Sequence, residues 1–195
     1  DLELATLGLI KGAVNGSSKN YEIIQGLMEK KEAKQEEDSI FVQIPVKDVA
    51  SSFVDVYRDI EDREHREYYF EGGRGSTKSS IISELIIELL ENNPTMCAVV
   101  LRKVKDTLKD SVFAQLEWAI ETLGETYPKV RSHWKLTKSP LEITNEATGQ
   151  KIYFRGADDY GKIKSLKPPP NMYSGITWYE EFDQFAGMLE VRKIN

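Results

Sequence analysis

A glycine-rich stretch, YYFEGGRGSTKSS at residues 68–80, combines the residue types that bind phosphate. Glycines let backbone N–H groups wrap an anion, and the first turn of a following helix points its amides and dipole at the same charge. Lys78 would reach the β and γ phosphates of ATP, and the Ser79 hydroxyl would coordinate Mg²⁺. The other positions expected to line the nucleotide are Gly72, Gly73, Arg74, Gly75, Ser76, Thr77 and Ser80.

One position departs from the strict phosphate-loop pattern, G-x-x-x-x-G-K-[ST]. Thr77 stands where the second glycine of that pattern is expected. Its Cβ restricts the backbone where the loop turns into the helix, so φ must take an allowed value there. The substitution does not by itself remove the amide cradle. The alternative interpretation is a glycine-rich turn before a helix, without a ligand.

A pair of carboxylates, Glu180 and Glu181, ends the apolar run GITWYEE at residues 175–181. Hydrolysis of a bound nucleotide needs one acid near the Mg²⁺ shell and one carboxylate that orients or deprotonates the attacking water. Glu180 is expected in the first role, through metal-bound water, and Glu181 in the second. A strand that ends in solvated charge would look the same, and the upstream loop is what favours the functional interpretation.

Two arginines lie where a guanidinium would neutralise charge that develops on a transferred phosphate. Arg74 is inside the loop and is expected to act as an internal finger or γ-phosphate sensor. Arg102 follows an apolar run and would act in its own chain or in a neighbouring subunit's site. A surface salt bridge is the alternative for each. Tyr57, with Arg58, would stack on adenine, or would simply pack in the core.

The order of apolar segments indicates the fold that these residues require. The expected elements are a helix over residues 46–60, a strand over 67–72, a helix from Lys78 to NNP at 92–94, a strand over 97–102, a helix from Asp106 or Thr107 to Gly124, a hairpin of PLEIT (140–144) and KIYFRG (151–156), and a strand over 175–179. This order is typical of doubly wound α/β proteins. We predict a P-loop NTPase fold of the ASCE type, with a central, mainly parallel sheet flanked by helices.

Composition and charge limit the function classes. The chain has 195 residues, of which 40% are hydrophobic and 30% charged, as in an ordinary globular domain. A net charge of −6 argues against a chain whose main role is to coat nucleic acid, but not against DNA contact through a basic patch. No apolar run approaches the roughly 20 residues of a membrane span. The single cysteine, Cys97, fits a reducing cytoplasm and is expected to pack in its strand.

Residues 1–47 are interpreted as an N-terminal helical appendage with a linker, and residues 48–195 as the P-loop domain. Because the chain starts at Asp1 and stops in a charged run, it is interpreted as part of a longer protein. No structural metal site is expected, and His65 and His133 are expected at the surface or hydrogen-bonded. The segment 154–170 would be a mobile lid, a DNA-facing loop or merely a solvated loop, with these basic residues: Arg155, Lys162, Lys164 and Lys167.

Four stretches together carry a family resemblance: GGRGSTKSS, VVLRKVKDTLKDSVFAQLEWAI, the run from KSPLEIT to SLKPP, and GITWYEEFDQF. They resemble the ATPase domain of the large terminase subunit of tailed bacteriophages, over roughly residues 53–186. The likeness is closest to the branch that packages DNA by a headful-type mechanism, and the glutamate pair belongs to that branch's pattern. The resemblance implies that Glu181 is the catalytic carboxylate and that Arg102 acts across a subunit ring.

The same resemblance implies an activity and partners. It implies ATP hydrolysis that drives double-stranded DNA into a procapsid, a ring of identical subunits on the portal protein, a small terminase subunit as partner, and a place in the host cytoplasm without a membrane. It also implies a metal-dependent nuclease domain, which residues 1–195 do not include. Two alternatives stay open: another P-loop DNA motor such as a helicase, and a non-hydrolysing assembly module whose nucleotide site is degenerate at Thr77.

Overall fold

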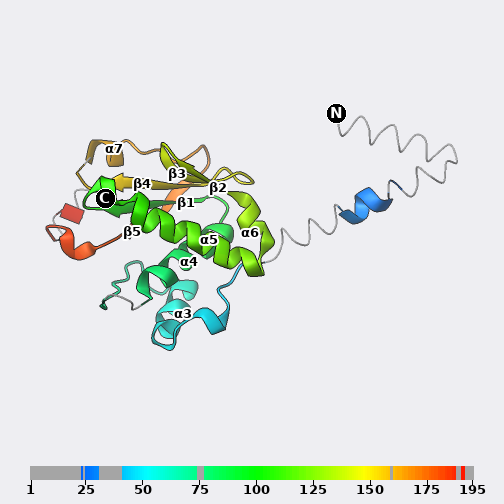
Figure 1. The fold of residues 1–195 in the computed structure, drawn as a ribbon, viewed down its shortest axis with the longest axis horizontal. Helices are drawn as coiled ribbons and strands as arrows, with labels where there is room; N and C mark the ends of the chain where they lie inside the picture. Colours follow the sequence, from blue (N-terminus) through cyan, green and yellow to red (C-terminus); the bar gives the residue numbers. More distant parts are fainter. Residues whose placement is uncertain are drawn as a thin grey trace. The chain divides into compact units, whose positions relative to one another are not determined.

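A five-stranded sheet forms the centre of residues Val42–Asn195 in a computed structural model of the protein (Figure 1). The structure describes residues 23, 25–30, 41–73, 77–158, 160–187 and 190–191. In the order β2–β3–β4–β1–β5, the strands are Trp134–Lys138 (β2), Leu141–Asn145 (β3), Lys151–Gly156 (β4), Met96–Arg102 (β1) and Tyr173–Tyr179 (β5). β1 pairs in parallel with β4 and β5, whereas β2, β3 and β4 form an antiparallel meander. The predicted α/β fold with a mainly parallel sheet is confirmed.

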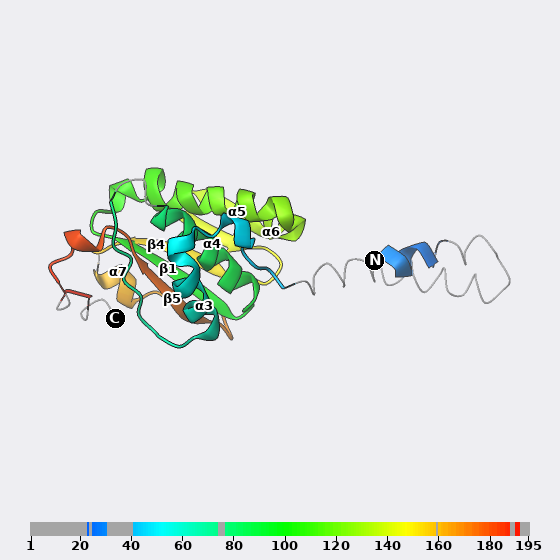
Figure 2. The ribbon, with the colours of Figure 1, turned by 90° about the horizontal axis from the view of Figure 1, so that it is seen from below.

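Helices cover both faces of the sheet. They are α3 (Val54–Asp62), α4 (Lys78–Glu91), α5 (Ala114–Thr126), α6 (Pro128–His133) and α7 (Tyr160–Lys164), with short 3-10 turns at Val46–Asp48, Ser51–Phe53, Lys105–Thr107 and Phe182–Gln184. α4, α5 and α6 pack against one face, which carries Val100 and Phe154 (Figure 2). Val99 and Leu101 alternate with them along β1 and pack on the other face, where Ile163 of α7 covers them.

The helix and the strand that follow the glycine loop in the chain, α4 and β1, are those predicted. α4 begins at Lys78 and ends at Glu91, where the Asn92 N–H donates to the carbonyl of Glu88 at 3.0 Å. β1 is buried along its whole length except at Arg102, as expected for a parallel strand covered on both faces. The predicted helix and the predicted buried strand are therefore confirmed.

The strand predicted over residues 67–72 is wrong. The structure describes residues 67–73, and none of them belongs to a strand. The backbone of this segment does not pair with a strand, but its aromatic rings contact other rings. The ring centroids of Phe70 and Phe53 lie 6.0 Å apart, and those of Tyr69 and Phe182 lie 5.7 Å apart. Aromatic residues favour strands because they fit a half-buried surface, and here side-chain contacts provide that surface without a ladder.

The helix predicted after β1 starts differently. Lys105–Thr107 forms a 3-10 turn, Lys109–Phe113 is π-helical, and α5 begins only at Ala114. The predicted cap is wrong, because no side chain caps these turns and the Thr107 hydroxyl donates to the carbonyl of Val104 at 2.9 Å. The apolar spacing is helical throughout, so it could not distinguish a π turn from an α turn.

Gly124 does not end α5, which continues to Thr126. A Cβ at this glycine would lie 2.8 Å from the Cβ of Arg131, so glycine here allows α6 to approach α5 closely.

Helix α6 and strand β2 were not predicted. The sequence of β2, WKLTK, is short and carries two lysines, and its alternation is too brief to mark a strand.

The compact unit begins at Val42, a few residues before the boundary predicted between residues 47 and 48. Val42 and Ile44 are buried, and side chains of α4 and its C-cap hold their backbone. The Asn92 amide exchanges two hydrogen bonds with the main chain of Val42, at 2.9 and 2.7 Å. Glu88 accepts the N–H of Ile44 at 2.7 Å. The segment is therefore part of the packed domain and not of a linker.

Within residues 1–41, the described residues 25–30 are helical. Most of the predicted N-terminal appendage lies outside the described residues. No helix in the described ranges combines the length and the apolar character needed to cross a membrane.

Two glutamates of α4 are buried in the core. Glu84 and Glu88 are 3% and 1% exposed. The pKa of each is raised to about 7, mainly by burial, to which the charge of Asp48 adds at Glu84. Hydrogen bonds from Ile44 N–H and the Tyr57 hydroxyl act in the opposite direction on Glu88. Both carboxyl groups are therefore more stable protonated in the folded chain than in the unfolded chain.

We predict that Glu88→Gln makes the stability of the fold less dependent on pH. An unfolded glutamate ionises near pH 4.5, whereas folded Glu88 keeps its proton up to about pH 7. The folded chain thus binds more protons between these values, and its free energy of unfolding falls as pH rises through that window. Urea unfolding measures the free energy of unfolding at pH 5 and at pH 8. Its decrease between these two pH values should be about 2–3 kcal/mol smaller in the variant than in the wild type.

Glu125→Gln is the matched control, because Glu125 is exposed on α5. It should leave the pH dependence as in the wild type. An unchanged pH dependence in Glu88→Gln would contradict the assignment of a raised pKa to Glu88.

Candidate functional site

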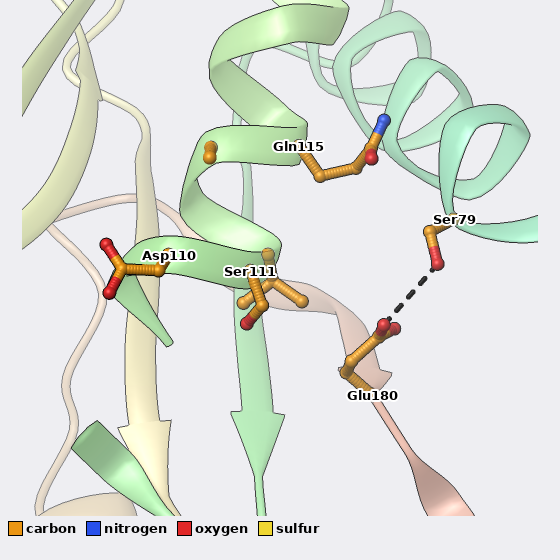
Figure 3. A pocket seen from close by; sticks show the side chains of 7 residues that line it. Ser79, Asp110, Ser111, Gln115 and Glu180 are labelled. Atoms are coloured by element: carbon orange, nitrogen blue, oxygen red, sulfur yellow. Dashed lines mark hydrogen bonds between the residues drawn. The ribbon is translucent and has the colours of Figure 1, made fainter. Parts of the chain in front are cut away.

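The start of α4 and the end of β5 meet at one point. The Ser79 hydroxyl donates to Oε1 of Glu180 at 3.4 Å, although the two residues are 101 positions apart (Figure 3). β5 pairs with β1 from Tyr173 to Tyr179, and the Glu180 N–H continues this ladder to the carbonyl of Leu101 at 2.9 Å. This hydrogen bond fixes the position of Glu180 at the edge of the sheet. The predicted metal-binding residues, Ser79 and Glu180, therefore lie together.

The described part of the glycine loop contacts Lys78. The Nζ of Lys78 donates a hydrogen bond to the carbonyl oxygen of Gly72, so the ammonium group lies against the loop. A Cβ on Gly73 would meet no atom within 4 Å, which leaves space beside its backbone. Ser80 lies in the first turn of α4. The central loop residues, Arg74, Gly75 and Ser76, lie outside the described residues.

Thr77 adopts the left-handed conformation that a glycine would occupy without strain. Its φ and ψ are 59° and 7°, at the residue that precedes α4. A β-branched residue rarely takes this conformation, because its Cβ crowds the backbone. Its carbonyl still accepts the N–H of Ile81 at 3.1 Å, which closes the first turn of the helix. The threonine thus holds a backbone conformation that suits glycine, at a cost in conformational energy.

Glu180 is a half-buried acid between charges of both signs. Burial raises the pKa of its carboxyl group, and the charge of Glu181 raises it further. The hydrogen bond from Ser79 and the charges of Arg102 and Lys78 lower it in part. A cation bound at this carboxylate would stabilise its ionised form in the same way.

Glu181 and Arg102 form an ion pair at the same edge of the sheet. Arg102 is the last residue of β1, and its Nε donates to Oε2 of Glu181 at 3.1 Å. Gln184 donates to the same oxygen at 2.6 Å, while Arg102 also donates to the carbonyl of Thr107 at 3.3 Å. Glu181 itself is left-handed, with φ 52° and ψ 54°. Strained residues of this kind cluster at functional sites.

A cavity of about 340 Å³ lies beside Ser79 and Glu180. Its lining residues are Ser79, Asp110, Ser111, Val112, Ala114, Gln115 and Glu180. The residues from the segment after β1 were not among the predicted site residues. The carboxyl ends of parallel strands share one edge of a sheet, and this rule was the available signal that the segment after β1 would lie near Glu180.

Tyr57, which was predicted either to stack on adenine or to pack in the core, packs in the core. It is buried in the main core, and its hydroxyl donates to Glu88 at 3.1 Å. The structure thus favours the packing interpretation of Tyr57 over the predicted contact with the base. Cys97 is buried in β1, as predicted.

The two histidines that the sequence singled out each lie beside a carboxylate. His65 bonds Asp59 through Nδ1 at 2.9 Å, and His133 lies 3.3 Å from Glu91, in agreement with the prediction for both. Asp59, Glu64 and His65 place three potential ligand atoms within 4.8 Å of one another.

The segment 154–170 is anchored on the sheet. Ile163 and Leu166 pack on the second face, and the Arg155 guanidinium lies over the ring of Tyr153, 5.6 Å from its centroid. These contacts tie part of the segment down. The exposed basic residues of the segment are Lys162, Lys164 and Lys167.

The fold and the site define an α/β protein in which a glycine-rich loop and a helix start meet a carboxylate from the end of a parallel strand. A sequence-family profile described as phage terminase large subunit matches residues 64–190. The chain is 40% identical over 142 residues to the terminase large subunit of Bacillus phage SPP1, which covers 73% of this chain and 32% of that protein. It is 35% identical over 123 residues to the PBSX phage terminase large subunit of Bacillus subtilis strain 168, which covers 62% of this chain and 25% of that protein.

The chain therefore belongs to the phage terminase large subunit family, as the resemblance of its motifs implied. It spans about a third or less of the length of these two relatives.

We predict that Thr77→Gly stabilises the fold. Glycine removes the left-handed strain of about 1–2 kcal/mol, and its greater freedom in the unfolded chain offsets about half of that gain. The melting temperature should rise by roughly 2–3 °C in a thermal unfolding scan. Thr122→Gly, inside α5, is the control and should lower it. A lower melting temperature for Thr77→Gly would contradict the strain assigned to Thr77.

Proposed function

We propose that this chain binds and hydrolyses Mg-ATP as the ATPase part of a DNA-packaging motor. The observation that carries the proposal is the 3.4 Å contact between Ser79 and Glu180. It joins a hydroxyl from the start of a helix to a carboxylate from the end of a parallel strand, which is the pairing that a nucleotide-bound Mg²⁺ requires. Lys78 beside Ser79 supplies positive charge for the β and γ phosphates. Gly72, Gly73, Arg74, Gly75, Ser76, Thr77 and Ser80 are the further proposed contacts to ATP.

The oxygens at this point suit Mg²⁺. The ion binds hard oxygen ligands at about 2.0–2.1 Å in octahedral geometry and keeps several waters, so adjacent ligand oxygens lie roughly 3 Å apart. Glu180 Oε1 lies 3.4 Å from Ser79 Oγ, close enough to accept a hydrogen bond from a water that occupies a neighbouring ligand position. We propose that Ser79 binds the ion directly and that Glu180 acts through a bound water. The ion, when bound, neutralises charge on the phosphates.

We propose Glu181 as the group that orients the attacking water and accepts its proton. Its side chain is 39% exposed, so water reaches it. Arg102 and Gln184 both donate to its Oε2 and hold the carboxylate in one orientation. Arg102 is therefore proposed as a positioning residue within its own chain, in addition to the role across a subunit ring that the resemblance implied. Arg74 is proposed to stabilise charge on the γ-phosphate.

The activity of the whole protein is part of the same proposal. The two relatives are terminase large subunits by name. We propose that the complete protein forms a ring at the portal of a procapsid, works with a small terminase subunit in the host cytoplasm, translocates double-stranded DNA and carries a nuclease domain. Family membership favours this packaging role over a helicase-like motor. The non-hydrolysing assembly module is the alternative that the next experiment separates.

We predict that Glu181→Gln separates binding from hydrolysis. The amide keeps the size of the side chain but cannot take a proton from water, so the rate of ATP hydrolysis should fall by about 100-fold or more. Binding of Mg-ATP should stay within about threefold of the wild type, because the proposed phosphate contacts are elsewhere. Phosphate release and equilibrium titration on the same samples measure the two quantities.

Asp183→Asn is the matched control, because Asp183 is an exposed acid in the 3-10 turn that follows Glu181. It should retain hydrolysis. Wild-type rates in Glu181→Gln would contradict the proposed role of Glu181, whereas a wild-type chain that neither binds nor hydrolyses Mg-ATP would favour the assembly module.

A further inference from the structure

A π-helical turn, Lys109–Phe113, lies beside the site. The Phe113 N–H donates to the carbonyl of Leu108, five positions back, at 3.1 Å. π turns are rare and occur frequently at functional sites, because the extra residue redirects the side chains around it. Residues of this turn and of the first turn of α5 line the cavity that Ser79 and Glu180 also line. The turn therefore brings a third element to the site.

Three polar side chains of this segment line the cavity, but they lie differently (Figure 3). The carboxylate of Asp110 points away from Ser79. The hydroxyl of Ser111 donates to the carbonyl of Thr107 at 2.6 Å, so its hydrogen is already engaged. The side chain of Gln115 extends towards α4, on the side where Ser79 lies. Gln115 is thus the residue of the three that is placed to meet a ligand held at Ser79.

The amide of Gln115 is held weakly. Its Nε2 donates to the Ser83 hydroxyl at 3.5 Å, the long limit of a hydrogen bond. Ser83 donates its own hydrogen to the carbonyl of Ser80 at 2.8 Å, so it keeps a partner if the amide turns away. Redirecting Gln115 to a ligand therefore costs little.

A carboxamide suits an anionic ligand at this place. It carries two N–H donors and does not titrate, so it offers hydrogens to a phosphate oxygen without adding charge. A hydrogen bond to a charged oxygen is stronger than one between neutral groups, so a phosphate would replace the long contact to Ser83. A carboxylate in the same position would be repelled by the phosphate and by Glu180.

We propose that Gln115 binds the terminal phosphate of the nucleotide and makes the site prefer a triphosphate to a diphosphate. The inference rests on the proposed ATP site and extends it to a specificity-determining residue of α5, outside both the glycine loop and the carboxylate pair.

The test is equilibrium titration of the 195-residue chain with the non-hydrolysable triphosphate AMP-PNP and with ADP, both with Mg²⁺. Gln115→Ala should weaken AMP-PNP by about tenfold, the effect of one hydrogen bond to a charged group, and should leave ADP within about twofold. Gln115→Glu keeps the length of the side chain and should weaken AMP-PNP further than Gln115→Ala does, by repulsion.

Asp110→Asn is the matched control, because Asp110 lines the same cavity and points away from Ser79. It should not reduce the preference for AMP-PNP over ADP. An equal loss of affinity for both nucleotides in Gln115→Ala, or no loss for either, would overturn the role of Gln115 and leave the ATP site intact. A wild-type chain that binds neither nucleotide would overturn the ATP site together with this inference. Melting temperatures near that of the wild type show that the variants are folded.

Discussion

The parallel pairing of β1 with β5 is the constraint on which the site depends. It runs from Met96 opposite Tyr173 to Leu101 opposite Tyr179, and the Glu180 N–H extends it by one more bond. Because both strands end at one edge, Arg102 at the end of β1 meets Glu181, which follows β5. The same edge faces the start of α4, which packs on the sheet and supplies Ser79. A shift of one residue in this register would turn Glu180 away from Ser79 and break the proposed metal site.

Several features of the site and of α4 cost stability. Thr77 and Glu181 both hold left-handed backbone conformations that non-glycine residues avoid. Glu84 and Glu88 are buried acids on the helix that begins with the proposed phosphate contacts. The apolar residues of α4, α5 and β1, packed as one core, offset these costs. Strain at the loop and at the second carboxylate is consistent with a backbone fixed for binding, because relaxed alternatives would move the side chains that the ligand needs.

The sequence predicted the elements whose patterns are long and unambiguous. α4 and β1 follow from apolar periodicity, and β5 with its carboxylates follows from an apolar run that ends in charge. The strand over residues 67–72 was predicted from aromatic propensity, which does not report which surface the rings meet. The π turn and the direction of Gln115 depend on the backbone path after β1, and the burial of Tyr57 depends on its partner Glu88, far away in the chain. Such tertiary contacts leave no local signal in the sequence.

The measurement that tests the central claim most directly is calorimetric titration of ATP into the wild-type chain and into Lys78→Ala, with and without Mg²⁺. An exposed lysine of β2, changed in Lys135→Ala, is the control. If the helix start and the carboxylate form a Mg-ATP site, the wild type and the control bind ATP more tightly with Mg²⁺, and Lys78→Ala binds at least about tenfold more weakly. Equal binding in the wild type and in Lys78→Ala, or no binding in either, would contradict it.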